Sequence, residues 1–180
     1  MASFGSAFVA LQRAQVVELI GEVLSGLTGL KAIHSCGNTD WSMVMQTPID
    51  ILSLDAYDYG GTLVRHASEL NAFLARGGIV AWGIVPASAV AQTETVEGLI
   101  ARLLRVLDEL VEAGVPRDML TRCGLVTPSC GMGSLSVPLA ESILALTGEV
   151  AHALRSRFGS PLPAQSEQSE ETLATDRRQS

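Results

Sequence analysis

A histidine and a cysteine two positions apart, His34 and Cys36, close an apolar run at residues 30–33. Alternate residues of a β-strand project to the same side, so this imidazole and this thiolate would converge just past a strand end. Cys130 ends a second apolar run at residues 123–129. One imidazole and two thiolates suit zinc, and three protein ligands leave a fourth position open, as in catalytic zinc sites.

The spacing of the two cysteines decides what kind of site this would be. Structural zinc sites commonly use C-x2-C pairs, whereas Cys36 and Cys130 are 94 positions apart. Ligands so distant meet only where the fold brings several strand ends together. The alternative is a core histidine with inert buried cysteines, and the residue types alone leave both interpretations open. Cys123, inside the second apolar run, is interpreted as a small core residue.

Composition narrows the class of protein. Hydrophobic residues make up 47% of the chain but aromatic residues only 4%, so the core must be aliphatic, which is typical of parallel strands covered by helices. The net charge of -7 argues against binding to nucleic-acid phosphates. No apolar run reaches the ~18 residues of a membrane span. Residues 1–13 lack the pattern of a signal peptide, so we expect a cytoplasmic protein with free or metal-bound thiols.

Strand-like and helical segments alternate along the chain. Strands are predicted at residues 30–34, 49–54, 79–85 and 122–127, and helices at 12–27, 40–45, 66–75, 94–113 and 137–158. This alternation predicts an α/β fold of parallel β/α units. Chemistry in such folds gathers at the carboxyl ends of strands, where His34, Cys36, Asp55 and Cys130 all lie.

Two further predictions concern domain limits and aromatic residues. Residues 1–158 are expected to form one domain, and the polar residues 159–180, rich in Pro, Ser and Glu, a disordered tail. Asp40 and Trp41 are interpreted as the cap and anchor of a short helix rather than as substrate contacts. Trp82 either packs in the core or lines a pocket, and the sequence leaves both open.

Four motifs together resemble one family, the uroporphyrinogen decarboxylase/cobalamin-independent methionine synthase superfamily. They are HSCGNTDW at 34–41, DILSLDAY at 50–57, AWGIVP at 81–86 and TPSCG at 127–131, in the family's order. The resemblance is closest to the carboxy-terminal zinc barrel of cobalamin-independent methionine synthase, and it covers roughly residues 1–157.

The resemblance implies a TIM-type (β/α)8 barrel in which zinc activates a thiol as methyl acceptor. The family's zinc ligands map onto His34, Cys36 and Cys130. Asp55 stands where the family has a glutamate ligand; being one methylene shorter, it would contact the site without binding the metal, or a water would complete the coordination. The implied activity is a methyltransferase of methionine biosynthesis, with a small thiol such as homocysteine as acceptor and a folate or corrinoid as methyl donor.

The family barrel has eight strands, whereas this chain has signals for the last four units. Residues 3–8 resemble the loop that follows the family's fourth strand. The chain is therefore expected to be a truncated product, one half of a split enzyme that needs a separate amino-terminal half-barrel, or half of a homodimeric barrel. Two rival functions remain: a non-catalytic zinc-binding subunit, and a tetrapyrrole decarboxylase, which needs no metal and leaves the cysteines unexplained.

Overall fold

The computed structural model describes residues 12–159. The strands are β1 (Ala32–Ser35), β2 (Ile51–Leu54), β3 (Ile79–Val85) and β4 (Gly124–Pro128). The α-helices are α1 (Arg13–Ser25), α2 (Trp41–Met45), α3 (Ala56–Tyr59), α4 (Ala67–Ala75), α5 (Val96–Glu112), α6 (Arg117–Arg122) and α7 (Val137–Phe158), with short 3-10 helices η1 (Gly60–His66) and η2 (Ala89–Thr93). The loop resemblance at 3–8 and the predicted disorder from 160 onward lie outside the described residues.

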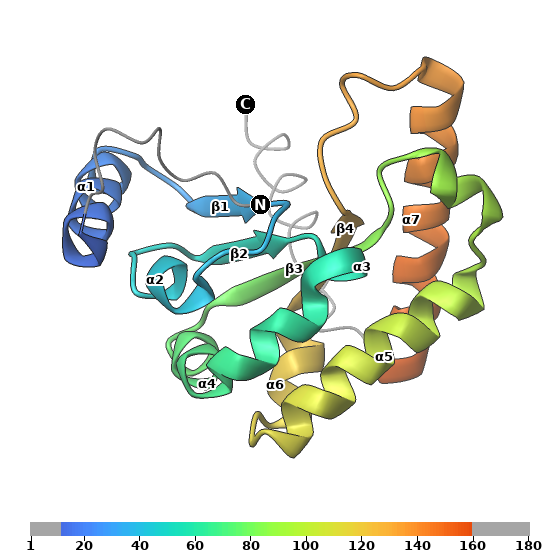
Figure 1. Ribbon diagram of the computed structural model, residues 1–180. Coiled ribbons are helices and arrows are strands. Elements are labelled where there is room, and N and C mark those ends of the chain that lie inside the picture. The colour runs from blue at the N-terminus through green and yellow to red at the C-terminus, as the bar shows by residue number, and fades with distance from the viewer. Residues whose placement is uncertain (1–11, 160–180) are drawn as a thin grey trace, which may run out of the picture.

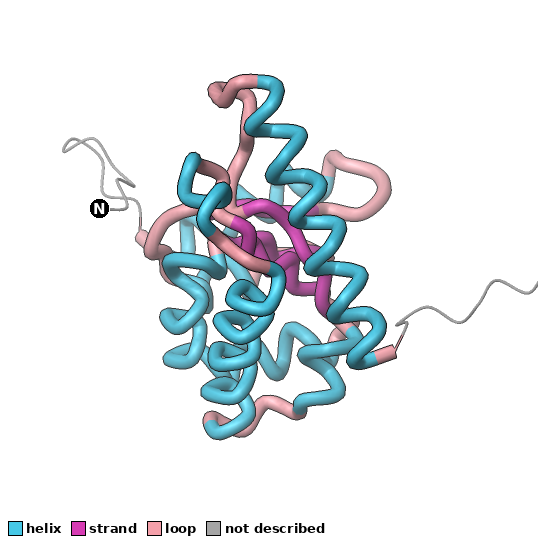
Figure 2. Tube along the Cα trace, turned by 90° about the vertical axis from the view of Figure 1, so that its right-hand side faces the viewer, coloured by secondary structure: helices cyan, strands magenta, loops and turns pink. Residues whose placement is uncertain are grey.

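The four strands form one sheet in which all neighbours are parallel and the order is β1-β2-β3-β4 (Figure 1). Connections between adjacent parallel strands are almost always right-handed, so a sequential order puts all the connecting helices on one side of the sheet. In Figure 2 the long helices pass in front of the strands on that side. The predicted α/β class with a parallel sheet is confirmed.

The hydrophobic core lies between this side of the sheet and the helices. Buried strand residues include Leu52, Leu54, Val80, Trp82 and Ile84, and buried helix residues include Leu70, Phe73, Leu99, Leu103, Leu107 and Leu110. On the opposite face of the sheet, His34 pairs with Ser53 and Ala81 pairs with Leu125. His34 and Leu125 are exposed there. One face of the sheet therefore holds the core, and the other face carries the candidate ligands.

Most predicted elements appear with small shifts in their ends. The strand at 79–85 and the helix at 137–158 have the predicted bounds. The first strand begins at Ala32 rather than at residue 30, since Leu30 remains outside the sheet and is 74% exposed. The last strand begins at Gly124, because a short helix that starts after Pro116 runs up to Cys123.

The predicted cap and anchor of the short helix α2 are confirmed. The Asp40 side chain accepts a hydrogen bond from the Met43 N–H, as an N-cap residue does. Trp41 is fully buried, and its Nε1–H donates to Thr62 Oγ1 at 2.8 Å. Both residues therefore fix the segment that follows His34 and Cys36 in the chain.

Among residues 12–159, α7 is the one helix long and apolar enough to cross a membrane. Length and composition alone do not identify a membrane-spanning helix, because a helix that covers a sheet can meet the same criteria. Ile143, Val150 and Leu154 on α7 are buried, and the helix contacts α5 and β4. Packing on α5 and β4 accounts for these buried residues, whereas Val137, Leu144 and Phe158 on the same helix remain exposed.

Candidate metal centre

Three potential metal ligands meet above the carboxyl ends of the two outermost strands. His34 lies in β1, Cys36 directly follows it, and Cys130 comes two residues after β4. Their ligand atoms all lie within 4.8 Å of one another, the one such group of three in the described part of the chain. The structure therefore brings together the three residues that the sequence predicted as ligands.

The sheet must curl strongly for these residues to meet. Neighbouring strands are about 4.8 Å apart, so β1 and β4 would be roughly 14 Å apart in a flat sheet. Gly83 in β3 permits the curl. A Cβ at this position would lie 2.4 Å from Leu54 O and 2.8 Å from Ser129 Cα, so only glycine lets the ends of β2 and β4 approach each other across β3.

A serine on the neighbouring strand orients the His34 ring. Ser53 is the direct register partner of His34, and its Oγ lies 2.9 Å from His34 Nδ1. When Nδ1 donates to Ser53, the lone pair on Nε2 is free to bind a metal, which is the usual arrangement around metal-bound histidines. The sequence analysis did not identify Ser53, because its contact with His34 depends on the register between β1 and β2.

The segment that carries Cys130 is fixed to the end of β3. The Ser129 N–H donates to Val85 O at 2.7 Å, and the buried Ser129 Oγ accepts from the Ala87 N–H at 3.0 Å. These two bonds hold the chain just past β4 against the chain just past β3. Cys130 is thereby directed over the concave face, toward β1.

The two thiols of the site influence each other. A hydrogen bond with Cys130, the charge of that second thiol and slight burial raise the pKa of Cys36 above its ordinary value. Without a metal, Cys36 therefore keeps its proton at neutral pH. Metal ligation requires thiolates, so a metal ion that binds here must displace protons. Cys36 is exposed and therefore accessible to such an ion.

Asp55 lies beside the three ligands but not among them. It directly follows β2, is buried, and accepts a hydrogen bond at Oδ1 from the Asp58 N–H at 2.9 Å, which caps α3. Burial raises the pKa of Asp55, an effect that the Asp58 N–H bond only partly offsets. Its carboxylate is outside the group whose ligand atoms lie within 4.8 Å of one another.

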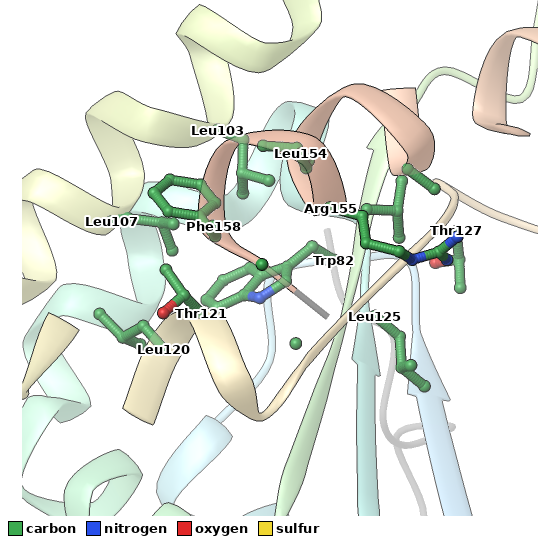
Figure 3. A pocket seen from close by; sticks show the side chains of 14 residues that line it. Trp82, Leu103, Leu107, Leu120, Thr121, Leu125, Thr127, Leu154, Arg155 and Phe158 are labelled. Atoms are coloured by element: carbon green, nitrogen blue, oxygen red, sulfur yellow. The ribbon is translucent and has the colours of Figure 1, made fainter. Parts of the chain in front are cut away.

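Cys123 has the structural role that the sequence predicted, and the structure places Trp82, for which the sequence left two interpretations open. Cys123 ends α6, its N–H donates to Met119 O, and its side chain packs against the core away from the ligand group. Trp82 is buried in the core and also lines a cavity of about 530 Å³ beside β4 (Figure 3). Both interpretations of Trp82 therefore hold at once.

The ligand group fits a zinc ion in chemistry and approximately in size. Zinc bonds of about 2.0–2.3 Å to nitrogen and sulfur place tetrahedral ligand atoms roughly 3.5–3.8 Å apart. Atoms that lie within 4.8 Å of one another need to close by no more than about 1 Å, which side-chain rotations supply. The group can therefore hold a metal ion, and its donor set favours zinc.

Comparisons of the chain with known protein families, with curated proteins and with solved structures found no match.

Proposed function

We propose that this chain is a zinc-dependent methyltransferase domain, a half-barrel that transfers a methyl group to a small thiol. Zinc would be held by His34, Cys36 and Cys130, and the acceptor would be homocysteine or a similar thiol. The methyl group would come from a folate or a corrinoid, as in methionine biosynthesis. The observation that carries the proposal is the meeting of one imidazole and two thiols at an accessible site at the carboxyl ends of parallel strands.

The bound zinc would supply one function: it would keep an acceptor thiol deprotonated at neutral pH, and a thiolate is the nucleophilic form. The chain's own residues do the rest. Ser53 holds the His34 ring in the orientation that ligation needs. Cys36 and Cys130 contribute negative charge, which favours a reactive acceptor sulfur. With three protein ligands, one coordination position is left for that acceptor.

Asp55 would act on the acceptor rather than on the metal. The Asp58 N–H donates to Oδ1 of Asp55, and the Tyr57 N–H also stabilises the carboxylate. Burial keeps its pKa raised, so the group is suited to take up or share a proton close to the site. We therefore assign Asp55 the role of orienting the incoming thiol and receiving its proton.

The half-barrel part of the proposal rests on strand order and curvature. Sequential parallel strands, helices on one face and a concave face that gathers the ligands are the features of a (β/α)8 barrel sector. Four strands amount to half of such a barrel. The three free cysteines fit a cytoplasmic location, where thiols stay reduced.

A second candidate is a zinc-binding half-barrel without catalytic activity. It is favoured by the open concave face, where Leu125 is 45% exposed and no second layer of described residues covers the sheet. Such a subunit would bind zinc and a partner but lack the surfaces that hold a methyl donor.

The test is metal analysis combined with an assay of methyl transfer. Protein purified in the presence of zinc should hold one ion per chain, and X-ray absorption should report one nitrogen and two sulfur ligands from the protein. Incubation with homocysteine and methyl-folate or methyl-corrinoid should then yield methionine. Zinc without turnover favours the non-catalytic candidate, and absence of zinc contradicts both.

A further inference from the structure

Most of the large apolar side chains that remain exposed lie near the two edges of the sheet, that is, near β1 and near β4. Nine are exposed within residues 12–159. Four lie on α1 and on the loop before β1, and four on β4 and α7. The first group is Leu19, Val23, Leu27 and Leu30, the second is Leu125, Val137, Leu144 and Phe158, and the ninth is Val90 on η2. Exposed apolar residues that form a contiguous patch mark a surface where another protein binds.

The β4 edge of the sheet also adjoins a cavity, here called the slot. The cavity of about 530 Å³ is lined by four consecutive residues of β4, 124–127, and by the carboxyl-terminal turns of α7 (Figure 3). β4 pairs with β3 alone, so its outer edge is unpaired among the described residues. The carboxyl-terminal turns of α7, together with Leu103 and Leu107 of α5 and Leu120 of α6, enclose this cavity beside the unpaired edge of β4.

The backbone of β4 offers hydrogen bonds to that space. Cys123 O accepts from the Val80 N–H on β3, and the Ser129 N–H donates to Val85 O. Backbone groups of alternate residues face opposite sides of a strand, so Val126 presents its N–H and C=O to the outer edge. An unpaired edge of this kind is a template for another strand.

We propose that two copies of this chain close into one eight-stranded barrel, with β1 of each copy docked in parallel against the outer edge of β4 in the other. The proposal rests on the half-barrel part of the proposed function and is independent of methyl transfer. β1 likewise has an unpaired edge among residues 12–159, and it has four residues, against five in β4. Because each chain carries both edges, two identical joints related by a two-fold axis complete the ring.

Packing and charge at the joint agree with this arrangement. α1 precedes β1 and contacts α2, and α7 follows β4 and contacts it, so in the proposed dimer both helices would lie near the joint with their exposed apolar residues. α7 ends near the amino end of β4, since Phe158 and Gly124 line the same slot, and α1 ends at Ser25, shortly before β1 begins at Ala32. Glu18 and Glu22 on α1 would there meet Arg155 and Arg157 on α7. None of these four forms an ion pair with another described residue.

Sedimentation of the full chain at micromolar concentration tests the proposal. The wild type should sediment at twice the 19.0 kDa of one chain. Val23→Glu places a charge in the joint and should raise the dimer dissociation constant at least ~10-fold. Val90→Glu is the matched control, because Val90 is similarly apolar and exposed but lies away from both edges, and it should leave the dimer intact.

Two further variants probe the strand pairing and the charges. Val126→Pro removes an N–H that faces the slot, not β3, so the chain should still fold and the dimer should dissociate. Arg155→Glu should weaken the dimer, and adding Glu22→Arg in the same chain should restore it, because each joint again carries opposite charges. Cooperative melting of every variant confirms that it is folded.

Three results would overturn the dimer: a wild-type monomer, a dimer indifferent to Val23→Glu, or a dimer lost in Val90→Glu. A monomer that dimerises once residues 160–180 are deleted would place the chain's own tail in the slot and equally overturn it. Zinc content measured on the same samples separates the two proposals. A monomeric Val23→Glu variant that keeps its zinc supports both, and a dimer without zinc supports only the barrel.

Discussion

The thiols of Cys36 and Cys130 lie against each other although the residues follow strands at opposite edges of the sheet. This contact depends on the curl of all four strands. A change that flattens the sheet anywhere between β1 and β4 should therefore separate the thiols. Metal binding at the candidate centre therefore depends on the curvature of the sheet.

Removal of either thiol ligand should abolish stable zinc binding. Changes to residues that only support a metal ligand typically cost ~10–100-fold in affinity, so Cys36→Ala and Cys130→Ala should each cost more than that. Cys123→Ala is the control, because Cys123 packs away from the ligand group. Zinc content after gel filtration is the measurement. Loss of zinc in Cys123→Ala with retention in Cys130→Ala would falsify the assignment.

Chelation should lower the melting temperature of the zinc-loaded wild type. A ligand at about a hundred times its dissociation constant stabilises the folded state by ~2.7 kcal/mol, so removing it lowers the free energy of unfolding by a similar amount. Cys130→Ala should melt at the same temperature with and without chelator. Thermal scans of the two proteins decide this, and an equal response in both would point to metal bound elsewhere.

Asp55→Asn should keep most of the zinc but weaken acceptor binding or turnover. Asparagine is as good an N-cap as aspartate, so α3 should remain intact and only the charge is removed. Asp55→Glu should reach closer to the metal and tighten the site. Asp58→Asn, one turn away, serves as control. Complete loss of zinc in Asp55→Asn would instead show that Asp55 is a direct ligand.

Gly83→Ala should damage both stability and metal binding. The new methyl group would lie 2.4 Å from Leu54 O and 2.8 Å from Ser129 Cα, which are backbone atoms that cannot move aside alone. We expect a loss of about 1–3 kcal/mol in the free energy of unfolding and weaker zinc binding in the protein that remains folded. Gly133→Ala has open space around the position and should change neither. Urea unfolding and zinc titration of both variants give the comparison.

Acid should weaken the interactions that the Asp40 carboxylate makes at the start of α2. Burial raises the pKa of Asp40, but hydrogen bonds from Ser42 Oγ and the Met43 N–H, together with the charge of Arg13, outweigh it and bring the pKa below its ordinary value. The stabilisation is therefore complete above the unfolded pKa of about 3.9 and is lost as pH falls through the lower folded value. Asp40→Asn should flatten the decline in melting temperature below pH ~4; an unchanged slope would exclude Asp40 as its source.

Much of the site could be predicted because it depends on short patterns. The i, i+2 spacing of His34 and Cys36 and the alternation of β and α segments were enough to place both residues at a strand end. The same logic placed Cys130 at the end of the last strand. Parallel strands end on the same side of a sheet, so the meeting of these residues followed from the topology.

The supporting residues could not be predicted, because they depend on register and close approach. Ser53 supports His34 only because the two are direct partners across β1 and β2. Gly83 matters only because β2 and β4 approach across it, and nothing local distinguishes it from the other glycines. The helix 117–122 was missed because six residues are too few to show a period, so Cys123 was placed in the strand instead of before it.

Because Cys36 and Cys130 are far apart along the chain, the candidate site can form only late in synthesis. During synthesis β1 is made first and β4 last, and no pair of neighbouring strands alone brings the two thiols together. A chain arrested before β4 is complete lacks the candidate metal centre, because it carries His34 and Cys36 without Cys130. Metal uptake by this protein would thus be a late event, and acquisition of zinc would report that the sheet has finished folding.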